Sequence, residues 1–122
     1  MSIDGTYKCQ VITHGNDELQ MKLISYGVMK LYQQDGELKG SMFPVFFWYQ
    51  APFRNGFTDG KRFKFTAYFN TPCQQYAMEV EGIVDEDGKV TGTATNPMGI
   101  CELVGEKISD EILTRYPNRG RI

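Results

Sequence analysis

Residues 62–93 read RFKFTAYFNTPCQQYAMEVEGIVDEDGKVTGT, and this stretch decides the fold class. Within it, side chains alternate between two faces with a period of two over residues 62–70 and again over residues 75–84. Turn residues separate the alternating segments, and Asp87-Gly88 is typical of a tight hairpin. Period-two alternation between turns predicts antiparallel β-strands that bury one face.

The same pattern continues over the rest of the chain, where Gly, Asp, Asn and Pro interrupt the alternation. Gly27 interrupts one long run, as a β-bulge or a break between two strands would. Eight short antiparallel strands favour closure of the sheet, because closure removes exposed edges. We therefore expect an all-β fold, an up-and-down barrel of about eight strands. The predicted strands cover residues 5–14, 18–33, 37–43, 47–57, 62–70, 75–84, 89–95 and 99–106.

Two similar segments suggest that the barrel consists of two halves. Residues 35–41 read DGELKGS and residues 87–93 read DGKVTGT, so both combine a DG turn, an aliphatic residue, a glycine and a hydroxyl residue. The second glycines, Gly40 and Gly92, would allow the strong strand bending that closure needs. We predict an internal repeat with halves of about 5–58 and 61–108.

The last residues differ from the strands. Ser109-Asp110-Glu111 precedes Ile112 and Leu113. A hydroxyl residue followed by acidic residues is typical of a helix start, since the helix dipole favours negative charge there. The sequence thus predicts one domain over residues 1–122, whose C-terminal extension, 109–122, contains a short helical turn covering one end of the barrel.

Composition excludes several classes of partner. The 122 residues include 13 basic and 15 acidic side chains, which gives a net charge of −2 and argues against nucleic acid. No segment reaches the roughly 20 apolar residues of a membrane helix, and the N-terminus does not resemble a signal peptide. Cys9, Cys73 and Cys101 are odd in number and form no CxxC pattern, so we expect free thiols and a cytoplasmic location.

One further set of residues in the second half consists of Phe65-Thr66, Thr71-Pro72, Met78, Gly82 to Asp85, Gly88 to Thr93 and Gly105 to Ile108. Through these residues the second half of the sequence resembles small bacterial lipocalin-like (calycin-type) β-barrel proteins of uncharacterised function. This resemblance implies a lipocalin-like barrel, a scaffold that hosts carriers, haem proteins and isomerases. The shared residues are turn glycines and barrel-facing positions, so they support a fold and carry no chemistry. Residues 43–57 depart from the family pattern.

The departing segment is unusually aromatic. Residues 43–53 read FPVFFWYQAPF. In a strand, Phe46 and Trp48 would point to one side, and Phe47 and Tyr49 to the other, so both faces are apolar. One face can fill the barrel. The other face requires a second surface, either a dimer partner or the C-terminal helical turn. A second interpretation, compatible with the first, is that the segment forms an aromatic wall or mouth for an apolar or aromatic ligand.

Few residues are candidates for catalysis. His14 is the only histidine and is expected at a barrel rim, where it is either a general acid or base or an exposed turn residue. Glu102 lies in an apolar strand: it faces solvent if Cys101 and Leu103 face inward, and otherwise becomes an inward acid with a raised pKa. A single histidine without a Cys/His cluster predicts no metal site, and we expect no cofactor.

Our leading hypothesis is a binder of a small apolar or aromatic molecule inside the barrel. Two alternatives stay open. One is a cofactor-independent isomerase or lyase that uses an acid–base pair from His14, Glu102 and the tyrosines. The other is a structural domain that forms a homodimer through its aromatic strand. The expected ligand-binding residues are Tyr7, Met21, Phe46, Trp48, Phe65 and Met78.

Overall fold

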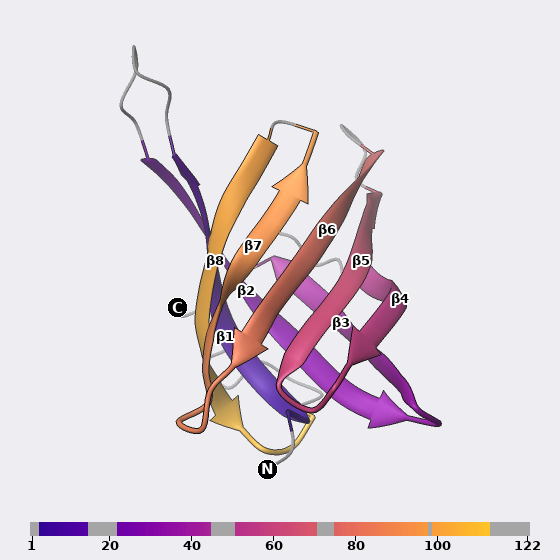
Figure 1. The fold of residues 1–122 in the computed structure, drawn as a ribbon. Coiled ribbons are helices and arrows are strands. Elements are labelled where there is room, and N and C mark those ends of the chain that lie inside the picture. The colour runs from indigo at the N-terminus through magenta and orange to yellow at the C-terminus, as the bar shows by residue number, and fades with distance from the viewer. Residues whose placement is uncertain (1–2, 15–21, 45–50, 71–74, 98, 113–122) are drawn as a thin grey trace.

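The computed structural model describes residues 3–14, 22–44, 51–70, 75–97 and 99–112. These residues form eight β-strands, drawn in Figure 1. No helix occurs among them, and none is therefore long and apolar enough to cross a membrane. The strands are β1 (Gly5–His14), β2 (Lys22–Gln34), β3 (Glu37–Pro44), β4 (Ala51–Thr58), β5 (Arg62–Asn70), β6 (Gln75–Val84), β7 (Lys89–Asn96) and β8 (Gly99–Ser109).

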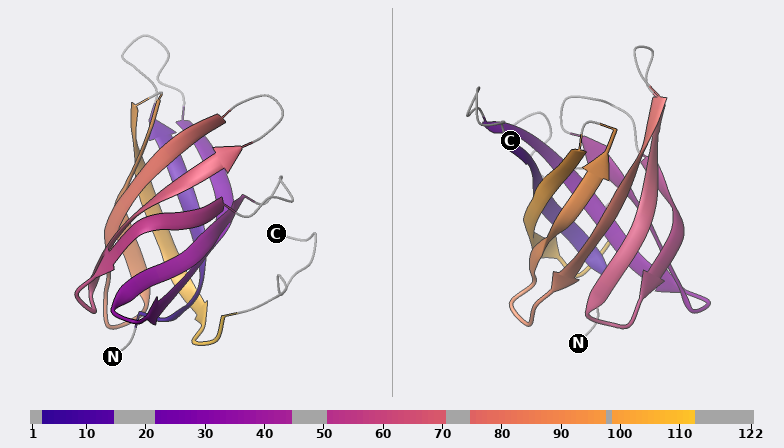
Figure 2. Two further views of the ribbon diagram at one scale, coloured as in Figure 1. Left: turned by 90° about the vertical axis from the view of Figure 1, so that its right-hand side faces the viewer. Right: turned by 45° about the horizontal axis from the view of Figure 1, so that its top comes forward.

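The strands close into one antiparallel barrel. Each strand pairs with the next along the chain, and β8 pairs with β1, as Figures 1 and 2 show from three sides. The β3–β4 ladder is the shortest, with only the Ser41–Pro52 and Met42–Ala51 pairs in register. The predicted all-β, eight-stranded antiparallel barrel is therefore confirmed.

The barrel has two different ends. The β2–β3, β4–β5 and β6–β7 turns lie at one end, together with Ile3; we call this the hairpin end (bottom of Figure 1). Strands β1, β3, β5 and β7 end, and β2, β4, β6 and β8 begin, at the opposite end, which we call the loop end. The aromatic residues 45–50 connect β3 to β4 and lie outside the described residues, as do 15–21, 71–74 and Met98.

The hairpin turns follow from their Asp and Gly residues. Asp35 and Gly36 have φ angles of +53° and +80° and form the entire β2–β3 connection. Positive φ at both positions gives a turn whose twist matches that of the strands. In the next two turns an aspartate accepts backbone hydrogen bonds: Asp59 from Lys61 and Arg62, and Asp85 from Asp87 and Lys89. The donors beside Asp59 hold the pKa of its carboxyl below the usual value.

Strand β4 contains a β-bulge that the alternation did not predict. Its register against β5 shifts between Arg54 and Phe57, and Asn55 adopts a φ of +55°. Because the extra residue reverses the alternation, Phe53 packs against the core while Phe57 is 60% exposed. The bulge thus removes one large aromatic side chain from the interior.

Two expectations change with the structure. Gly27 neither breaks nor bulges its strand: β2 runs through it, and Gly27 pairs in register with Cys9 on one side and Pro44 on the other. The predicted C-terminal helical turn is not seen in residues 109–112. Ser109 instead ends β8, and its Oγ accepts a hydrogen bond from the Glu111 amide at 3.1 Å. The rest of that prediction concerns residues 113–122, outside the described part.

Candidate functional site

Large side chains fill the interior at the hairpin end. Tyr7, Leu31, Phe63 and Val84 are all at most 1% exposed. Further along the axis, the Phe53 and Phe65 rings stack with centroids 3.5 Å apart, and the Phe65 and Phe63 centroids are 6.0 Å apart. This half of the barrel is a packed hydrophobic core, which fills the interior at the hairpin end.

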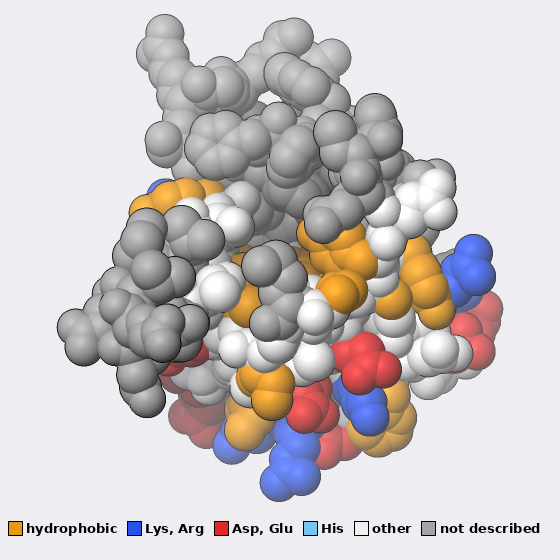
Figure 3. Space-filling view, turned by 90° about the horizontal axis from the view of Figure 1, so that it is seen from above, with side chains coloured by type: hydrophobic (Ala, Val, Ile, Leu, Met, Phe, Trp, Pro, Cys, Tyr) orange, Lys and Arg blue, Asp and Glu red, His pale blue; other side chains and the backbone are white. Residues whose placement is uncertain are grey.

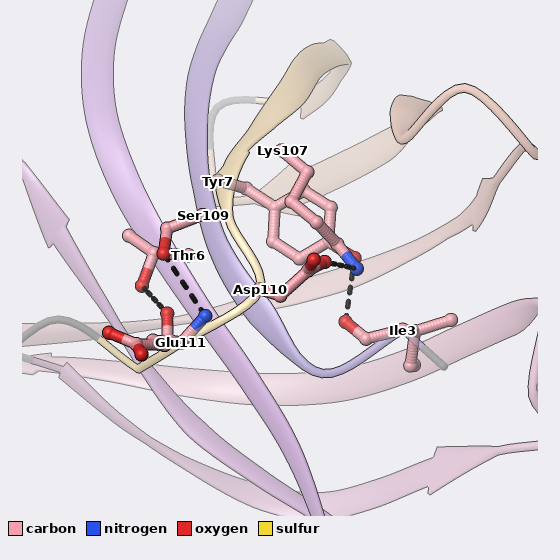
Figure 4. Close-up of polar contacts among 7 residues, drawn as sticks. All are labelled: Ile3, Thr6, Tyr7, Lys107, Ser109, Asp110 and Glu111. Atoms are coloured by element: carbon pink, nitrogen blue, oxygen red, sulfur yellow. Dashed lines mark hydrogen bonds and ion pairs between the residues drawn. The ribbon is translucent and has the colours of Figure 1, made fainter. Parts of the chain in front are cut away.

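Polar contacts fasten the chain across the hairpin end, as Figure 4 shows. The Tyr7 hydroxyl donates a 2.6 Å hydrogen bond to the carbonyl oxygen of Ile3. Lys107 Nζ lies 3.2 Å from Asp110 Oδ1 and 5.7 Å from the centre of the Tyr7 ring. Thr6 Oγ1 donates to the Glu111 carbonyl at 2.7 Å. The N-terminal residues and the end of β8 are therefore tied together below the core.

Toward the loop end two of the inward-facing side chains are small, although Met78 and Tyr76 on β6 are large. On the inward face of β5, Ala67 follows Phe63 and Phe65, and on β7, Ala94 lies between Val90 and Asn96. Both alanines are fully buried. Seen from the loop end, hydrophobic side chains lie near the middle of the molecule (Figure 3). We call this region the loop-end interior and define it by Thr13, Met42, Ala67, Met78, Ala94, Asn96 and Cys101.

One polar group lies within this apolar region. Thr13 Oγ1 is 3.3 Å from Cys101 Sγ, and Asn96 Nδ2 donates to the same sulfur at 3.7 Å. The three side chains come from β1, β7 and β8, which are adjacent in the barrel. Cys101 is 2% exposed, while Thr13 and Asn96 are partly exposed. The arrangement presents a hydroxyl, an amide and a thiol, all uncharged, at one side of the loop-end interior.

The interior disfavours negative charge. Burial raises the pKa of the Cys9 thiol to about 12, and it also raises the pKa of the Tyr76 phenol, which packs against the core on β6. In both groups the cause is loss of water around the ionised form. An acid placed in this interior is therefore driven toward its neutral form.

The structure places three of the predicted ligand-binding residues. Met78 is buried in the loop-end interior, and Phe65 lies just below it in the aromatic stack. Tyr7 lies at the hairpin end, where it is part of the packed core. Met21, Phe46 and Trp48 lie outside the described residues, so their predicted roles stay predictions.

The catalytic candidates do not meet in the described interior. Glu102 is exposed on the outer face of β8, because Cys101 and Leu103 face inward, which is the orientation in which it faces solvent. His14 ends β1, but its side chain lies outside the described part. Among the described residues, no group of three or more His, Cys, Asp or Glu side chains could hold a metal ion.

Sequence reasoning missed the polar group. Thr13 has the same parity as Tyr7, Cys9 and Val11, so strict alternation along β1 would have placed it inside the barrel. The predicted strand 89–95 stopped one residue before Asn96, yet Asn96 is the last residue of β7 and shares the inward parity of Ala94. The alternation therefore indicates that both side chains face inward, and extending it to the ends of the strands would have predicted this.

Neither a scan against protein-family models nor a search of curated proteins found a match for this chain. The site must therefore be interpreted from its own geometry.

Proposed function

We propose that this protein is a lipocalin-like binder that holds a small apolar or aromatic molecule in the loop-end interior. The observation that supports this most is a pair of small, fully buried side chains beyond the stacked phenylalanines. Stacked phenylalanines fill the hairpin end, whereas the inward positions nearer the loop end include the small side chains of Ala67 and Ala94. Eight-stranded barrels are wide enough to hold one small ligand where side chains do not fill them.

The character of the surrounding side chains also suits a variable apolar ligand. Met42 and Met78 are each 5% exposed and belong to the core cluster around this region. Methionine side chains are unbranched and polarisable, so they adapt to irregular shapes and contact aromatic rings favourably. Such a lining fits a ligand that has an apolar body.

The proposal predicts that N-phenyl-1-naphthylamine, a neutral aromatic probe that fluoresces in apolar surroundings, binds saturably to one site. Enlarging a wall residue should compete with the probe for the same space. We expect Ala94→Leu to weaken binding by about tenfold or more, equivalent to about 1.4 kcal/mol. A fluorescence titration of wild-type protein and variant measures both effects.

The matched control is Ala77→Leu, the same substitution at an exposed position on the outer face of β6. This variant should bind the probe like the wild type. The proposal fails if the wild type gives no saturable signal. It also fails if Ala94→Leu binds the probe as tightly as the wild type does. A third contrary result is that the wild type binds no probe and Ala94→Leu lowers the unfolding free energy by about 1–3 kcal/mol, because that loss is typical of overpacking a filled core.

A further inference from the structure

Strand β4 has the fewest ladder pairs of the eight described strands. It forms two pairs in register with β3 and four with β5, whereas β5 and β6 share nine pairs. We call the boundary between residues 37–40 of β3 and 53–58 of β4 the seam, because these segments adjoin without pairs in register. They are nevertheless in contact, since a Cβ on Gly56 would overlap the Leu38 carbonyl oxygen. Weakly paired segments open at a lower free energy than the rest of a domain, so we expect the barrel to open most easily at the seam.

The ring of Phe53 packs against the core at this seam. Phe53 pairs with Ala67 on β5, and its ring stacks on that of Phe65, with the ring centroids 3.5 Å apart. On the β3 side, a Cβ on Gly40 would lie 3.0 Å from Cε2 of the ring. The ring therefore reaches from β5 to the backbone of β3 and closes the seam from within. Because residue 40 is a glycine, the edge of the ring meets backbone there and is not held by a side chain of that residue.

Phe53 borders both the solvent and the loop-end interior. Phe63 and Phe65 are each 1% exposed, whereas Phe53 is only partly buried. Ala67, its partner on β5, is fully buried and belongs to the loop-end interior. Displacing the Phe53 ring from its stack would therefore give a molecule from solvent access to the wall of the loop-end interior at Ala67.

We infer that Phe53 is the gate of a lateral opening between β3 and β4, through which the apolar or aromatic ligand enters the loop-end interior. This inference rests on the proposed function, because it assigns the entry route to that binding site. In the closed state the Phe53 ring stacks on Phe65, as it does in this structure. In the open state β4 separates from β3 at the seam and the ring leaves the stack. Little backbone pairing opposes this movement, since β3 and β4 share only two pairs in register.

The first test needs neither a ligand nor a variant. Hydrogen–deuterium exchange measured by mass spectrometry should show that the amides of residues 53–58 exchange at least about tenfold faster than those of residues 75–84. The reason is that β6 forms nine pairs with β5 and six with β7, so its amides are released only when longer ladders open. If both segments exchange at the same rate, β4 does not open separately and the inference is overturned.

The second test locks the seam with a disulfide bond. Continuing the register of the Ser41–Pro52 pair places Lys39 opposite Arg54, and both side chains are exposed. In the oxidised Lys39→Cys/Arg54→Cys protein, the association and dissociation rates of N-phenyl-1-naphthylamine should each fall by about tenfold or more, because the gate cannot open. The dissociation constant should stay unchanged, since the site itself is intact. Stopped-flow fluorescence measures both rates, and reduction with dithiothreitol should restore them.

The matched control is Lys64→Cys/Glu81→Cys, which bridges two exposed residues that pair directly between β5 and β6. Peptide mapping by mass spectrometry verifies each bridge against the native cysteines. This control should bind and release the probe at the wild-type rates, because β5 and β6 stay paired in the open state. Phe53→Ala tests the ring itself: with no ring to displace, both rates should rise by about threefold or more.

The outcomes separate the entry route from the proposed function. If the wild-type protein binds no probe, the proposed function fails and the inference fails with it. If the wild type binds the probe and the oxidised Lys39→Cys/Arg54→Cys protein binds and releases it at the same rates, the barrel is a binder but the inferred entry route is wrong. The inference is also overturned if the Lys64→Cys/Glu81→Cys bridge slows binding equally, or if Phe53→Ala, folded by circular dichroism, leaves both rates unchanged.

Discussion

Replacing Gly92 by alanine is expected to prevent the barrel from folding stably. A Cβ at this position would lie 2.1 Å from the Glu81 carbonyl oxygen and 2.6 Å from the Gly82 Cα. Both atoms belong to the backbone of β6, which pairs with β7 through Gly82 and Gly92 themselves. No side-chain rotation can relieve the overlap, so the two strands must separate and lose part of their ladder.

We expect this variant to lose more than about 4 kcal/mol of unfolding free energy, a large share of the ~5–15 kcal/mol typical of a domain. Urea denaturation followed by circular dichroism measures the change. Gly36→Ala is the control, because nothing lies within 4 Å of its Cβ and only its φ of +80° opposes the substitution. That strain costs about 1–2 kcal/mol. If the two variants are equally stable, the close approach at Gly92 does not exist.

Truncating Phe65 should cause the next largest loss of stability. Its ring is 1% exposed and lies between those of Phe53 and Phe63, with centroid distances of 3.5 and 6.0 Å. Phe65→Ala removes these contacts and leaves a cavity in the part of the core that closes the interior. The expected cost is about 3–5 kcal/mol.

Phe57→Ala is a matched control for this variant. The β4 bulge places Phe57 outside, where it is 60% exposed, so its truncation should change stability by no more than about 0.5 kcal/mol. Thermal and urea denaturation of both variants distinguish the two sites. Equal losses for Phe57→Ala and Phe65→Ala would show that the bulge does not divide the aromatic residues between interior and surface.

Much of the fold follows from local signals in the sequence. The DG pairs specify tight turns, and strict alternation from Arg62 to Val84 fixes which side chains face inward, so strand number and the ends of β5 and β6 were predictable. The bulge at Asn55 was not, because it depends on how β4 packs against β5 rather than on the residues of β4 alone. The prediction that Gly27 bulges or breaks its strand was wrong for a related reason. A glycine within a closed barrel can remain paired in register with both neighbouring strands, as Gly27 does with Cys9 on β1 and Pro44 on β3.

The candidate site was predictable only in part. Alternation identified Phe65 and Met78 as inward-facing, but it gave no position along the barrel axis, and so it could not separate the packed end at Tyr7 from the loop-end interior. That distinction comes from the topology, which gathers Ile3, Tyr7 and Lys107 at one end. The emphasis on the aromatic segment concerned residues 43–57, of which 45–50 lie outside the described part, so the role of that segment remains a prediction.

The most direct test of the central claim is methyl NMR of protein labelled at the methionine ε-carbons, titrated with 2-naphthol. Met42 and Met78 lie in the loop-end interior, and Met42→Leu and Met78→Leu assign their signals. The proposal predicts that both methyl resonances shift, through the ring current of the bound naphthalene, and saturate at one molecule per chain. If the probe leaves both resonances unchanged at concentrations that saturate binding measured by calorimetry, or if no binding occurs, the barrel interior is not the ligand site.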